Sequence, residues 1–204
     1  MDKPTYIVRA DGTSLRFPKG SKIAHKIGLS GKFYEHAMLE AIREMGLEGT
    51  YVDIGAHVGN HSVYFATRCK AAHVIAVEPN PENLVLLREN TSGLPVTVEA
   101  FAVGYSAGYI EVDGMKGRVS ASRLSTFLPP TTVFVKMDIE GWETPALEGS
   151  LDAIERVKPA GFAIENHGGV ESVTHKRQVA LLEPLGYRLV GVYNHTPTML
   201  WRLR

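Results

Sequence analysis

From residue 50 onward, short runs rich in β-branched and aromatic residues alternate with longer segments of helical periodicity. Strands that alternate with helices predict an α/β fold in which a parallel sheet is covered by helices on both faces. The predicted strands are 50–54, 73–78, 96–99, 132–138 and 161–165, and a terminal pair over 187–192 and 198–203. The predicted helices are 60–68, 81–90, one that carries Leu147, Leu151 and Ile154, and 173–183.

The first 47 residues read differently and predict an extension to a main domain of residues 48–204. Two strand-like runs, 6–9 and 14–17, flank Asp11-Gly12, a dipeptide typical of a tight hairpin turn. A helix is predicted over 34–45, where Gly46 ends it. Residues 113–131 are rich in Gly, Ser and Pro with little periodicity, which predicts an irregular segment, either a connector or a mobile wall over a substrate site.

Composition excludes several classes of function. With 204 residues, 44% of them hydrophobic, the chain suits one compact domain. The 22 basic residues balance the 22 acidic ones, so a broad positive field for nucleic acid or an anionic membrane is not expected. No apolar run approaches the roughly 20 residues of a membrane span, and the N-terminus does not resemble a secretory signal. With one cysteine, Cys69, the chain is expected to be cytoplasmic.

Acidic residues stand at or just inside the ends of four predicted strands: Asp53, Glu78, Asp138 and Glu165. In an open α/β sheet the ligand crevice lies beyond the carboxyl ends of the strands. Four acids at these positions therefore predict a polar, functional rim along that edge of the sheet.

The turn after the first strand of the main domain narrows the choice of ligand. Gly55 permits a tight turn and Gly59 lets the next helix approach the strand, but His57 stands where a dinucleotide fold needs a glycine. Asp53 would repel a pyrophosphate, whereas Glu78, 23 residues after Gly55, has the spacing of an acid that binds ribose hydroxyls. A ligand with a ribose and a positive end, such as S-adenosylmethionine, fits. A plain structural turn beside a solvated acid is the alternative.

Three blocks of the sequence, 52–62 (VDIGAHVGNHS), 74–80 (VIAVEPN) and 135–143 (VKMDIEGWE), together resemble the FkbM-type methyltransferases. The resemblance covers about residues 48–167. It implies a class I Rossmann-like fold, with a seven-stranded, mostly parallel sheet and an antiparallel C-terminal strand. It also implies methyl transfer from S-adenosylmethionine to a hydroxyl of a small molecule or glycan, of the sugar or polyketide type.

The resemblance assigns the cofactor to the loops after the first three strands of the main domain. Residues of the first loop, Asp53, Gly55, Ala56 and Gly59, are expected at the methionine end, and Glu78 on the ribose. Pro79, Asn80, Ala102 and Val103 are expected around the adenine. The predicted cofactor residues are Asp53, Gly55, Ala56, His57, Gly59, Asn60, Glu78, Pro79, Asn80, Ala102 and Val103, and His57 stands where the family commonly has Asn.

Acceptor activation is expected at the fourth and fifth strands. Asp138 is the leading candidate for the base that takes the hydroxyl proton and Glu140 is the second, with Glu165 or His167 assisting. Alternatively, Asp138, Glu165 and Asn166 would supply oxygen ligands to Mg²⁺, as in catechol-type O-methyltransferases.

Other side chains have structural explanations. Lys136, inside a strand, is expected to pair with a nearby acid, and Glu143 to favour the start of a helix. His57 and His61 lack a third zinc ligand. Trp142 is equally compatible with the core or with a substrate platform. Solvated charges are the simplest interpretation of Arg118 and Arg123.

Three other functions stay open. A methyltransferase of protein or nucleic acid is disfavoured by the neutral charge and by the absence of an Asn-Pro-Pro-aromatic motif after the fourth strand, where the chain reads Asp138-Ile-Glu-Gly. A cofactor-binding scaffold without activity is the second, because 204 residues leave little acceptor-binding structure. A dehydrogenase is the third.

Overall fold

The computed structural model describes residues 4–112, 115, 117–193 and 197–204. Residues 113–114 and 116 of the expected mobile wall, and 1–3 of the N-terminal extension, lie outside the described residues. The centre of the fold is a seven-stranded sheet in the order β11-β12-β10-β9-β3-β4-β5. Its strands are β3 (Gly49–Ile54), β4 (Ala71–Val77), β5 (Val96–Glu99), β9 (Thr132–Met137), β10 (Gly161–Glu165), β11 (Tyr187–Tyr193) and β12 (Thr198–Leu203).

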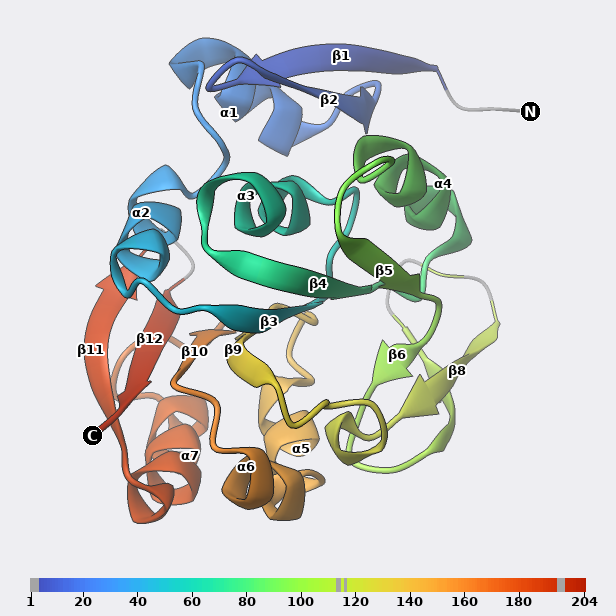
Figure 1. The fold of residues 1–204 in the computed structure, drawn as a ribbon. Helices are drawn as coiled ribbons and strands as arrows, with labels where there is room; N and C mark the ends of the chain where they lie inside the picture. The colour runs from blue at the N-terminus through green and yellow to red at the C-terminus, as the bar shows by residue number, and fades with distance from the viewer. Residues whose placement is uncertain (1–3, 113–114, 116, 194–196) are drawn as a thin grey trace.

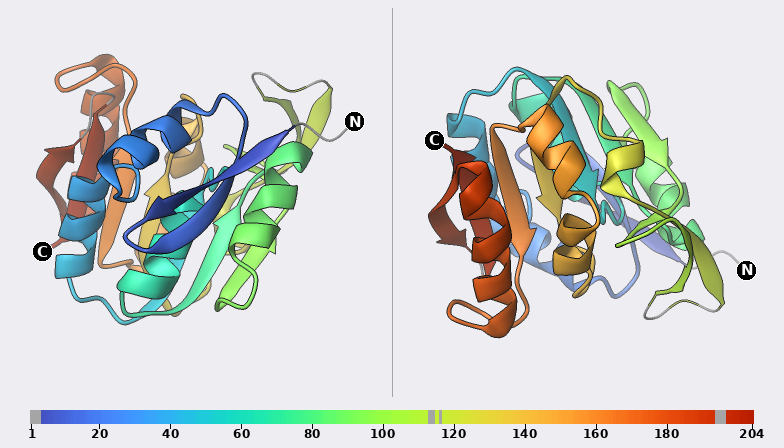
Figure 2. Two further views of the ribbon diagram at one scale, coloured as in Figure 1. Left: turned by 90° about the horizontal axis from the view of Figure 1, so that it is seen from above. Right: turned by 90° about the horizontal axis from the view of Figure 1, so that it is seen from below.

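Five of these strands, β10, β9, β3, β4 and β5, run parallel, whereas β12 runs antiparallel between β10 and β11. The predicted α/β fold, with a mostly parallel sheet and an antiparallel C-terminal strand, is therefore confirmed. Helices α2 (His36–Glu44), α3 (Asn60–Arg68) and α4 (Pro81–Asn90) cover one face, and α5 (Glu143–Glu148), α6 (Leu151–Val157) and α7 (Val173–Leu182) cover the other (Figures 1 and 2).

The hairpin predicted at the N-terminus is present and lies outside the helical layer (Figure 1). Strands β1 (Thr5–Ala10) and β2 (Thr13–Pro18) pair through a turn in which Asp11 and Gly12 both have positive φ, 47° and 81°. The hairpin is attached to both helices beneath it. Arg68 of α3 donates to the Asp11 carbonyl (2.8 Å), and the Asn90 side chain of α4 exchanges hydrogen bonds with the Arg16 backbone (2.7 and 2.9 Å). Helix α1 (Lys22–Ser30), which the sequence pattern did not predict, follows the hairpin.

The segment expected to be irregular is more ordered than its composition indicates. Strand β8 (Arg118–Ser122) joins β6 (Ala102–Val103) and β7 (Gly108–Glu111) in a small three-stranded sheet, followed by the 3₁₀ turn η1 (Leu124–Thr126). Leu124 and Leu128 are buried in the hydrophobic core beneath the large sheet. The expectation of an irregular segment was therefore wrong for residues 118–128, because apolar side chains anchor them.

The helix predicted through Leu147, Leu151 and Ile154 is two helices, broken at Gly149-Ser150. At Gly149 a Cβ atom would lie 2.1 Å from the Tyr105 carbonyl oxygen, so the break coincides with a close approach of another backbone segment. A second 3₁₀ turn, η2 (Glu183–Leu185), links α7 to β11. None of the helices in the described ranges is long and apolar enough to cross a bilayer.

Candidate active site

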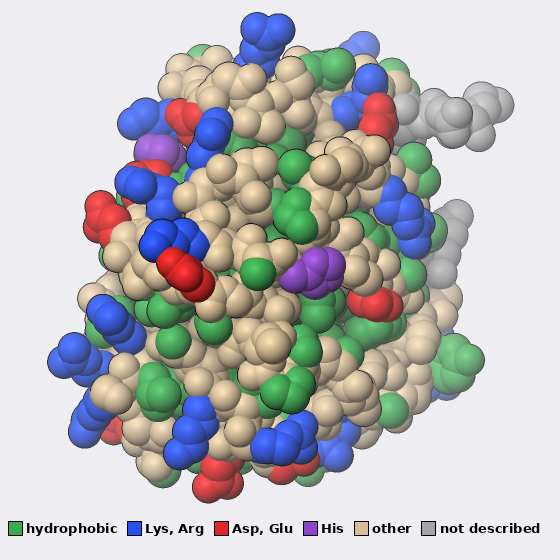
Figure 3. Space-filling view, in the orientation of Figure 1, with side chains coloured by type: hydrophobic (Ala, Val, Ile, Leu, Met, Phe, Trp, Pro, Cys, Tyr) green, Lys and Arg blue, Asp and Glu red, His purple; other side chains and the backbone are tan. Residues whose placement is uncertain are grey.

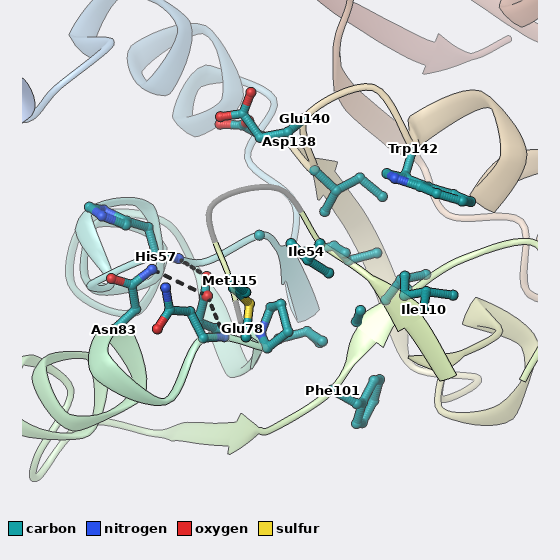
Figure 4. A pocket seen from close by; sticks show the side chains of 18 of the residues that line it. Ile54, His57, Glu78, Asn83, Phe101, Ile110, Met115, Asp138, Glu140 and Trp142 are labelled. Carbon is teal, nitrogen blue, oxygen red and sulfur yellow. Dashed lines mark hydrogen bonds between the residues drawn. The ribbon is translucent and has the colours of Figure 1, made fainter. Parts of the chain in front are cut away.

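A cavity of about 320 Å³ opens at the carboxyl ends of β3, β4 and β9. This volume lies at the lower end of the range of about 300–1,000 Å³ that is usual for small-molecule sites. Figure 4 shows acidic side chains along one side of the cavity and apolar ones along another. The lining residues are Ile23, Ile54, Gly55, His57, Val77, Glu78, Pro79, Asn80, Asn83, Phe101, Ala102, Val103, Ile110, Val112, Met115, Asp138, Ile139, Glu140 and Trp142.

The loop after β3 forms the floor of the cavity because of its glycine. Gly55 has a φ of +77°, and a Cβ atom there would lie 1.8 Å from the carbonyl oxygen of Asp138. Only glycine therefore lets the loop after β3 touch the loop after β9. His57, two residues on, also has a positive φ, 51°, which turns its backbone N–H toward Glu78.

Glu78 is the best-held polar side chain of the cavity. It is buried, and its carboxylate accepts from the His57 and Asn80 backbone N–H groups, both at 2.8 Å, and from the Asn83 side chain at 3.3 Å (Figure 4). Burial raises the pKa of this carboxyl, and the three hydrogen bonds act in the opposite direction. The carboxylate is thus fixed in position at the end of β4, facing the cavity.

The far side of the cavity is apolar. Phe101, Ala102, Val103, Ile110 and Val112 come from β6, β7 and their flanking residues. The Phe101 ring packs edge-on against Phe127, with centroids 5.0 Å apart, so the residue that follows η1 supports this wall. A flat apolar group is the natural occupant of such a wall.

An ion-pair network centred on Lys136 of β9 adjoins the acidic side of the cavity through Asp138 and lies otherwise outside the lining. The Lys136 ammonium lies 3.2 Å from an Asp53 carboxylate oxygen and 3.6 Å from one of Asp138, and it donates to the Gly55 carbonyl at 2.9 Å. The expected pairing of Lys136 with a nearby acid is confirmed. Asp53 also accepts from the Ser62 hydroxyl at 2.6 Å and is fully buried.

Beyond Asp138, three more titratable side chains adjoin one another. The His167 ring nitrogen lies 3.0 Å from a Glu165 oxygen and 3.8 Å from a Glu140 oxygen. Burial, reinforced by a hydrogen bond and charge repulsion from Asp138, raises the pKa of Glu165 to about 9. For Asp138 burial is the largest influence, but Lys136 and the hydrogen bond with Glu165 overcome it and lower the pKa. At neutral pH, Asp138 is therefore the ionised member of the pair and Glu165 holds the proton.

The N-terminal segment closes this side of the site. Ile23 of α1 lines the cavity. Burial is the main cause that raises the pKa of the Tyr34 phenol to about 12, with further contributions from the charges of Glu35, Asp138 and Glu165. Next to it, His61 of α3 lies 3.3 Å from a Glu35 oxygen and stacks on the Tyr34 ring.

The structure brings most of the residues expected from the sequence to the cavity. Gly55, His57, Glu78, Pro79, Asn80, Ala102, Val103, Asp138 and Glu140 line it. Glu165 and His167 are outside the lining but contact its acidic side, through Asp138 and Glu140 respectively.

Four expected cofactor residues are not in the lining: Asp53, Ala56, Gly59 and Asn60. Neighbouring strand residues point to opposite faces, so Asp53 faces α3 and Lys136 whereas Ile54 reaches the cavity. Asn60 is also buried, and its side chain exchanges hydrogen bonds with the Tyr34 backbone. At Gly59 a Cβ atom would lie 2.8 Å from Leu87 of α4, so this glycine serves helix packing.

Among the lining residues, several come from outside the sequence motifs: Ile23, Asn83, Phe101, Ile110, Val112 and Met115. Asn83 lies five residues after Glu78, at the start of α4. This closeness in sequence to Glu78 is a local signal from which Asn83 could have been predicted. The others come from α1 and from the small sheet and its flanks, which the sequence pattern left without regular structure.

Of the three expected magnesium ligands, Asp138 and Glu165 lie together, whereas Asn166 is bound elsewhere. The Asn166 side chain is fully buried and turned toward α7, where it accepts from the Gly168 backbone N–H (3.0 Å) and the Ser172 hydroxyl (3.3 Å) and donates to Gln178 (3.4 Å). In the described part of the chain, two other groups have ligand atoms within 4.8 Å of one another. These groups are Asp138, Glu143 and Glu165, and Glu140, Glu165 and His167.

Glu143 already has structural partners, since it is buried at the start of α5 and accepts from the backbone N–H groups of Ile139 (2.7 Å) and Gly141 (3.3 Å).

Trp142 is 40% exposed and lines the cavity, which favours the substrate-platform interpretation over the core. Arg123 donates to the Gly149 carbonyl and pairs with Asp152, and Arg118 donates to the Tyr109 carbonyl, so neither faces the cavity as an anion ligand.

Comparison with known proteins adds family information. The family model described as "Methyltransferase FkbM domain" matches residues 116–189. A curated relative, the hexuronic acid methyltransferase AglP of Haloferax volcanii, is 28% identical over 140 residues, which are 58% of this chain and 56% of that protein. The chain thus spans about half the length of this relative.

Solved structures show the same fold. The methyltransferase FkbM from Methylobacillus flagellatus superposes with a TM-score of 0.57 at 24% identity, covering 76% of this chain and 43% of that one. TYW2 of M. jannaschii, solved in complex with AdoMet, superposes with a TM-score of 0.56 at 15% identity, covering 98% and 85%. The architecture is therefore the class I, Rossmann-like methyltransferase fold.

Proposed function

We propose that the chain belongs to the FkbM methyltransferases, which its three motifs resemble and whose family model matches residues 116–189, and that it transfers a methyl group from S-adenosylmethionine to a hydroxyl of a sugar or similar small molecule. The observation that carries the proposal is the position of Glu78. Its fixed carboxylate stands between an apolar wall and an acidic wall of one cavity.

The residues of the cavity fit this cofactor. The apolar wall of Phe101, Ala102 and Val103 suits the adenine, and Glu78 can accept hydrogen bonds from ribose hydroxyls. Asp138 and Glu140 offer negative charge to the sulfonium end. When bound, S-adenosylmethionine supplies an electrophilic methyl group for direct displacement by the acceptor oxygen.

In the proposed mechanism the chain orients the acceptor and removes its proton. The acceptor O–H donates to the Asp138 carboxylate, which takes the proton as the new O–C bond forms. Lys136 and the proton on Glu165 both favour the ionised state of Asp138 before the reaction. A positioned base of this kind contributes about 10²- to 10⁴-fold to the rate. His167 and Glu140, both in contact with solvent, can pass the proton outward.

The proposal includes no magnesium step. Of the expected ligands, Asn166 is committed to α7, and Glu143, which takes part in one of the two acidic groups, is committed to the backbone of its own loop. We therefore expect methyl transfer to survive EDTA, and loss of activity that Mg²⁺ restores would show that an ion takes part.

Two alternatives from the sequence have less support. For nucleic-acid methylation the neutral charge is unfavourable, and basic and acidic side chains are both present on the face shown in Figure 3. An inactive scaffold would not need the Asp138–Glu165 proton pair at the cavity.

A sugar acceptor agrees with the name of the Haloferax volcanii relative. The proposed location is the cytoplasm, and we treat residues 1–47 as an extension to the domain 48–204.

The test is a transfer assay with S-adenosylmethionine labelled in the methyl group and a panel of sugars, nucleotide sugars and polyketide alcohols. Base-stable label on one class of hydroxylated acceptor supports the proposal. Binding of S-adenosylmethionine without transfer to any acceptor would favour the scaffold, and label on RNA or protein would replace the acceptor class.

A further inference from the structure

The N-terminal segment of residues 12–34 carries a net positive charge, although the chain as a whole is neutral. Residues 12–34 contain five basic residues and neither Asp nor Glu. The remaining residues then hold 17 of the 22 basic residues against all 22 acidic ones. Several Lys and Arg side chains lie over the top of the view in Figure 3, where Figure 1 places the hairpin and α1. The basic residues of the segment are Arg16, Lys19, Lys22, Lys26 and Lys32.

Four of the five have no carboxylate partner in the described part of the chain. Arg16 pairs with Glu89 at 2.6 Å. Lys19, Lys22, Lys26 and Lys32 are exposed, and among the described residues no ion pair joins any of them to an acid. By contrast, Lys70 and Lys176 elsewhere on the surface do pair with glutamates. Unpaired lysines on one short segment leave a local positive field.

Two of these lysines belong to helix α1, which contributes one side chain to the cavity lining. That side chain is Ile23, between Lys22 and Lys26. The Lys26 ammonium lies 4.9 Å from the centre of the Tyr34 ring. The charges of Asp138 and Glu165 contribute to the raised pKa of the Tyr34 phenol, so these three side chains are near one another. Lys22 and Lys26 are one helical turn apart, so their side chains share a face of α1. We call Lys22 and Lys26 the basic rim.

Inside the cavity the charge is of the opposite sign. Asp138 and Glu140 line it, with Glu165 in contact with Asp138. An anionic group is disfavoured beside these carboxyls and favoured at the basic rim. A molecule that matches both regions has an uncharged hydroxyl-bearing part inside and an anionic group outside.

We propose that the basic rim binds the phosphate or diphosphate group of the acceptor, while the neutral sugar attached to it presents a hydroxyl to Asp138. Lysine is a compact point charge suited to phosphate, and a diphosphate has enough anionic oxygens to contact both ammonium groups. The group can come from a nucleoside diphosphate sugar or from a lipid-linked diphosphate sugar. This assignment rests on the proposed methyl transfer, because it makes the phosphate part of the acceptor.

The experiment measures binding, so that it does not depend on turnover. Inorganic pyrophosphate is titrated by calorimetry into the wild type, into Lys22→Ala/Lys26→Ala and into the matched control Lys70→Ala/Lys176→Ala, each saturated with S-adenosylhomocysteine. We expect the dissociation constant to rise at least about tenfold in the rim variant, which is about 1.4 kcal/mol, and not to change in the control. The wild-type constant should also rise with salt.

Further titrations identify the source of the phosphate. UDP-glucose and geranylgeranyl diphosphate are compared with pyrophosphate, and tighter binding of either one identifies the carrier. No binding of pyrophosphate to the wild type, or equal loss in both double variants, would overturn the proposal. So would a short RNA that binds more tightly than all three probes. If the rim variant instead loses S-adenosylhomocysteine affinity, the lysines hold the cofactor and the proposal is wrong, whereas failure of the wild type to bind that ligand contradicts the proposed function itself.

Discussion

The two halves of the cavity are built in different ways. On the cofactor side, Glu78 is held by backbone N–H groups and by a side chain of the adjoining helix, and the apolar wall is packed from behind. On the acceptor side, Asp138, Glu165, Glu140 and His167 interact mainly with one another. The first arrangement fixes a shape, and the second lets charge and protons shift among side chains. A site that binds one constant ligand and performs proton transfer on another needs both.

The two halves meet at Gly55, so the strongest way to break the comparison is Gly55→Ala. The added Cβ would lie 1.8 Å from the Asp138 carbonyl oxygen, at a φ of +77°. We expect unfolding free energy to fall by about 3 kcal/mol or more, or the chain not to fold, by denaturant titration. Gly104→Ala is the matched control, because a Cβ there meets nothing within 4 Å. Equal stability of the two variants would show that the loops do not touch.

Asp138→Asn separates the halves by function. The substitution keeps the shape of the side chain but removes the base, so we expect kcat to fall by about 10²- to 10⁴-fold. Affinity for S-adenosylhomocysteine should change by less than about threefold, because Glu78 and the apolar wall are untouched. Steady-state kinetics and calorimetry check the two values, with Asp152→Asn as the control on an exposed acid. Full activity in Asp138→Asn would exclude it as the base.

Glu165→Gln is expected to have the smallest effect of the three substitutions, a change in how the unfolding free energy depends on pH. It tests whether Asp138 and Glu165 share a proton. Because the folded state raises the Glu165 pKa from 4.5 to about 9, its stabilising contribution is complete below about pH 4.5. That contribution is lost as the pH rises through about 9, so unfolding free energy should decline over this window in the wild type. We expect Glu165→Gln to flatten the decline in urea titrations from pH 5 to 9. The exposed-site control Glu155→Gln should keep the wild-type slope, and an unchanged slope in both would contradict a shared proton.

Sequence pattern predicts the fold best where local signals agree. The predicted boundaries of α3, α4, β5 and β10 match the structure. In α4, for example, Pro81 begins the helix and the Asn80 side chain caps it. Helix α1 is not predicted from the sequence, although the Ser21 side chain caps its first turn and Ala24 and Ile27 are buried. The pattern joins α5 and α6 because the contact between Gly149 and Tyr105 lies far away in the sequence.

For the site, position at a strand end is a good predictor and side-chain direction is not. Glu78 and Asp138 follow their strands and reach the cavity, as expected. Asp53 lies one residue before the end of its strand and faces the opposite side, where Lys136 and Ser62 hold it. The walls that come from α1 and from the small sheet depend on contacts between distant segments, which no local pattern records.

The central claim is that the cavity binds S-adenosylmethionine through Glu78, and calorimetric titration of S-adenosylmethionine and S-adenosylhomocysteine tests it most directly. The account predicts binding to the wild type, with NAD as the negative control. It also predicts a dissociation constant about 10- to 100-fold higher in Glu78→Ala, because a charged acceptor of hydrogen bonds is lost, and no change in Glu82→Ala on the exposed side of α4. Tighter binding of NAD, no binding of either methyl ligand, or equal binding to Glu78→Ala and the wild type would contradict it.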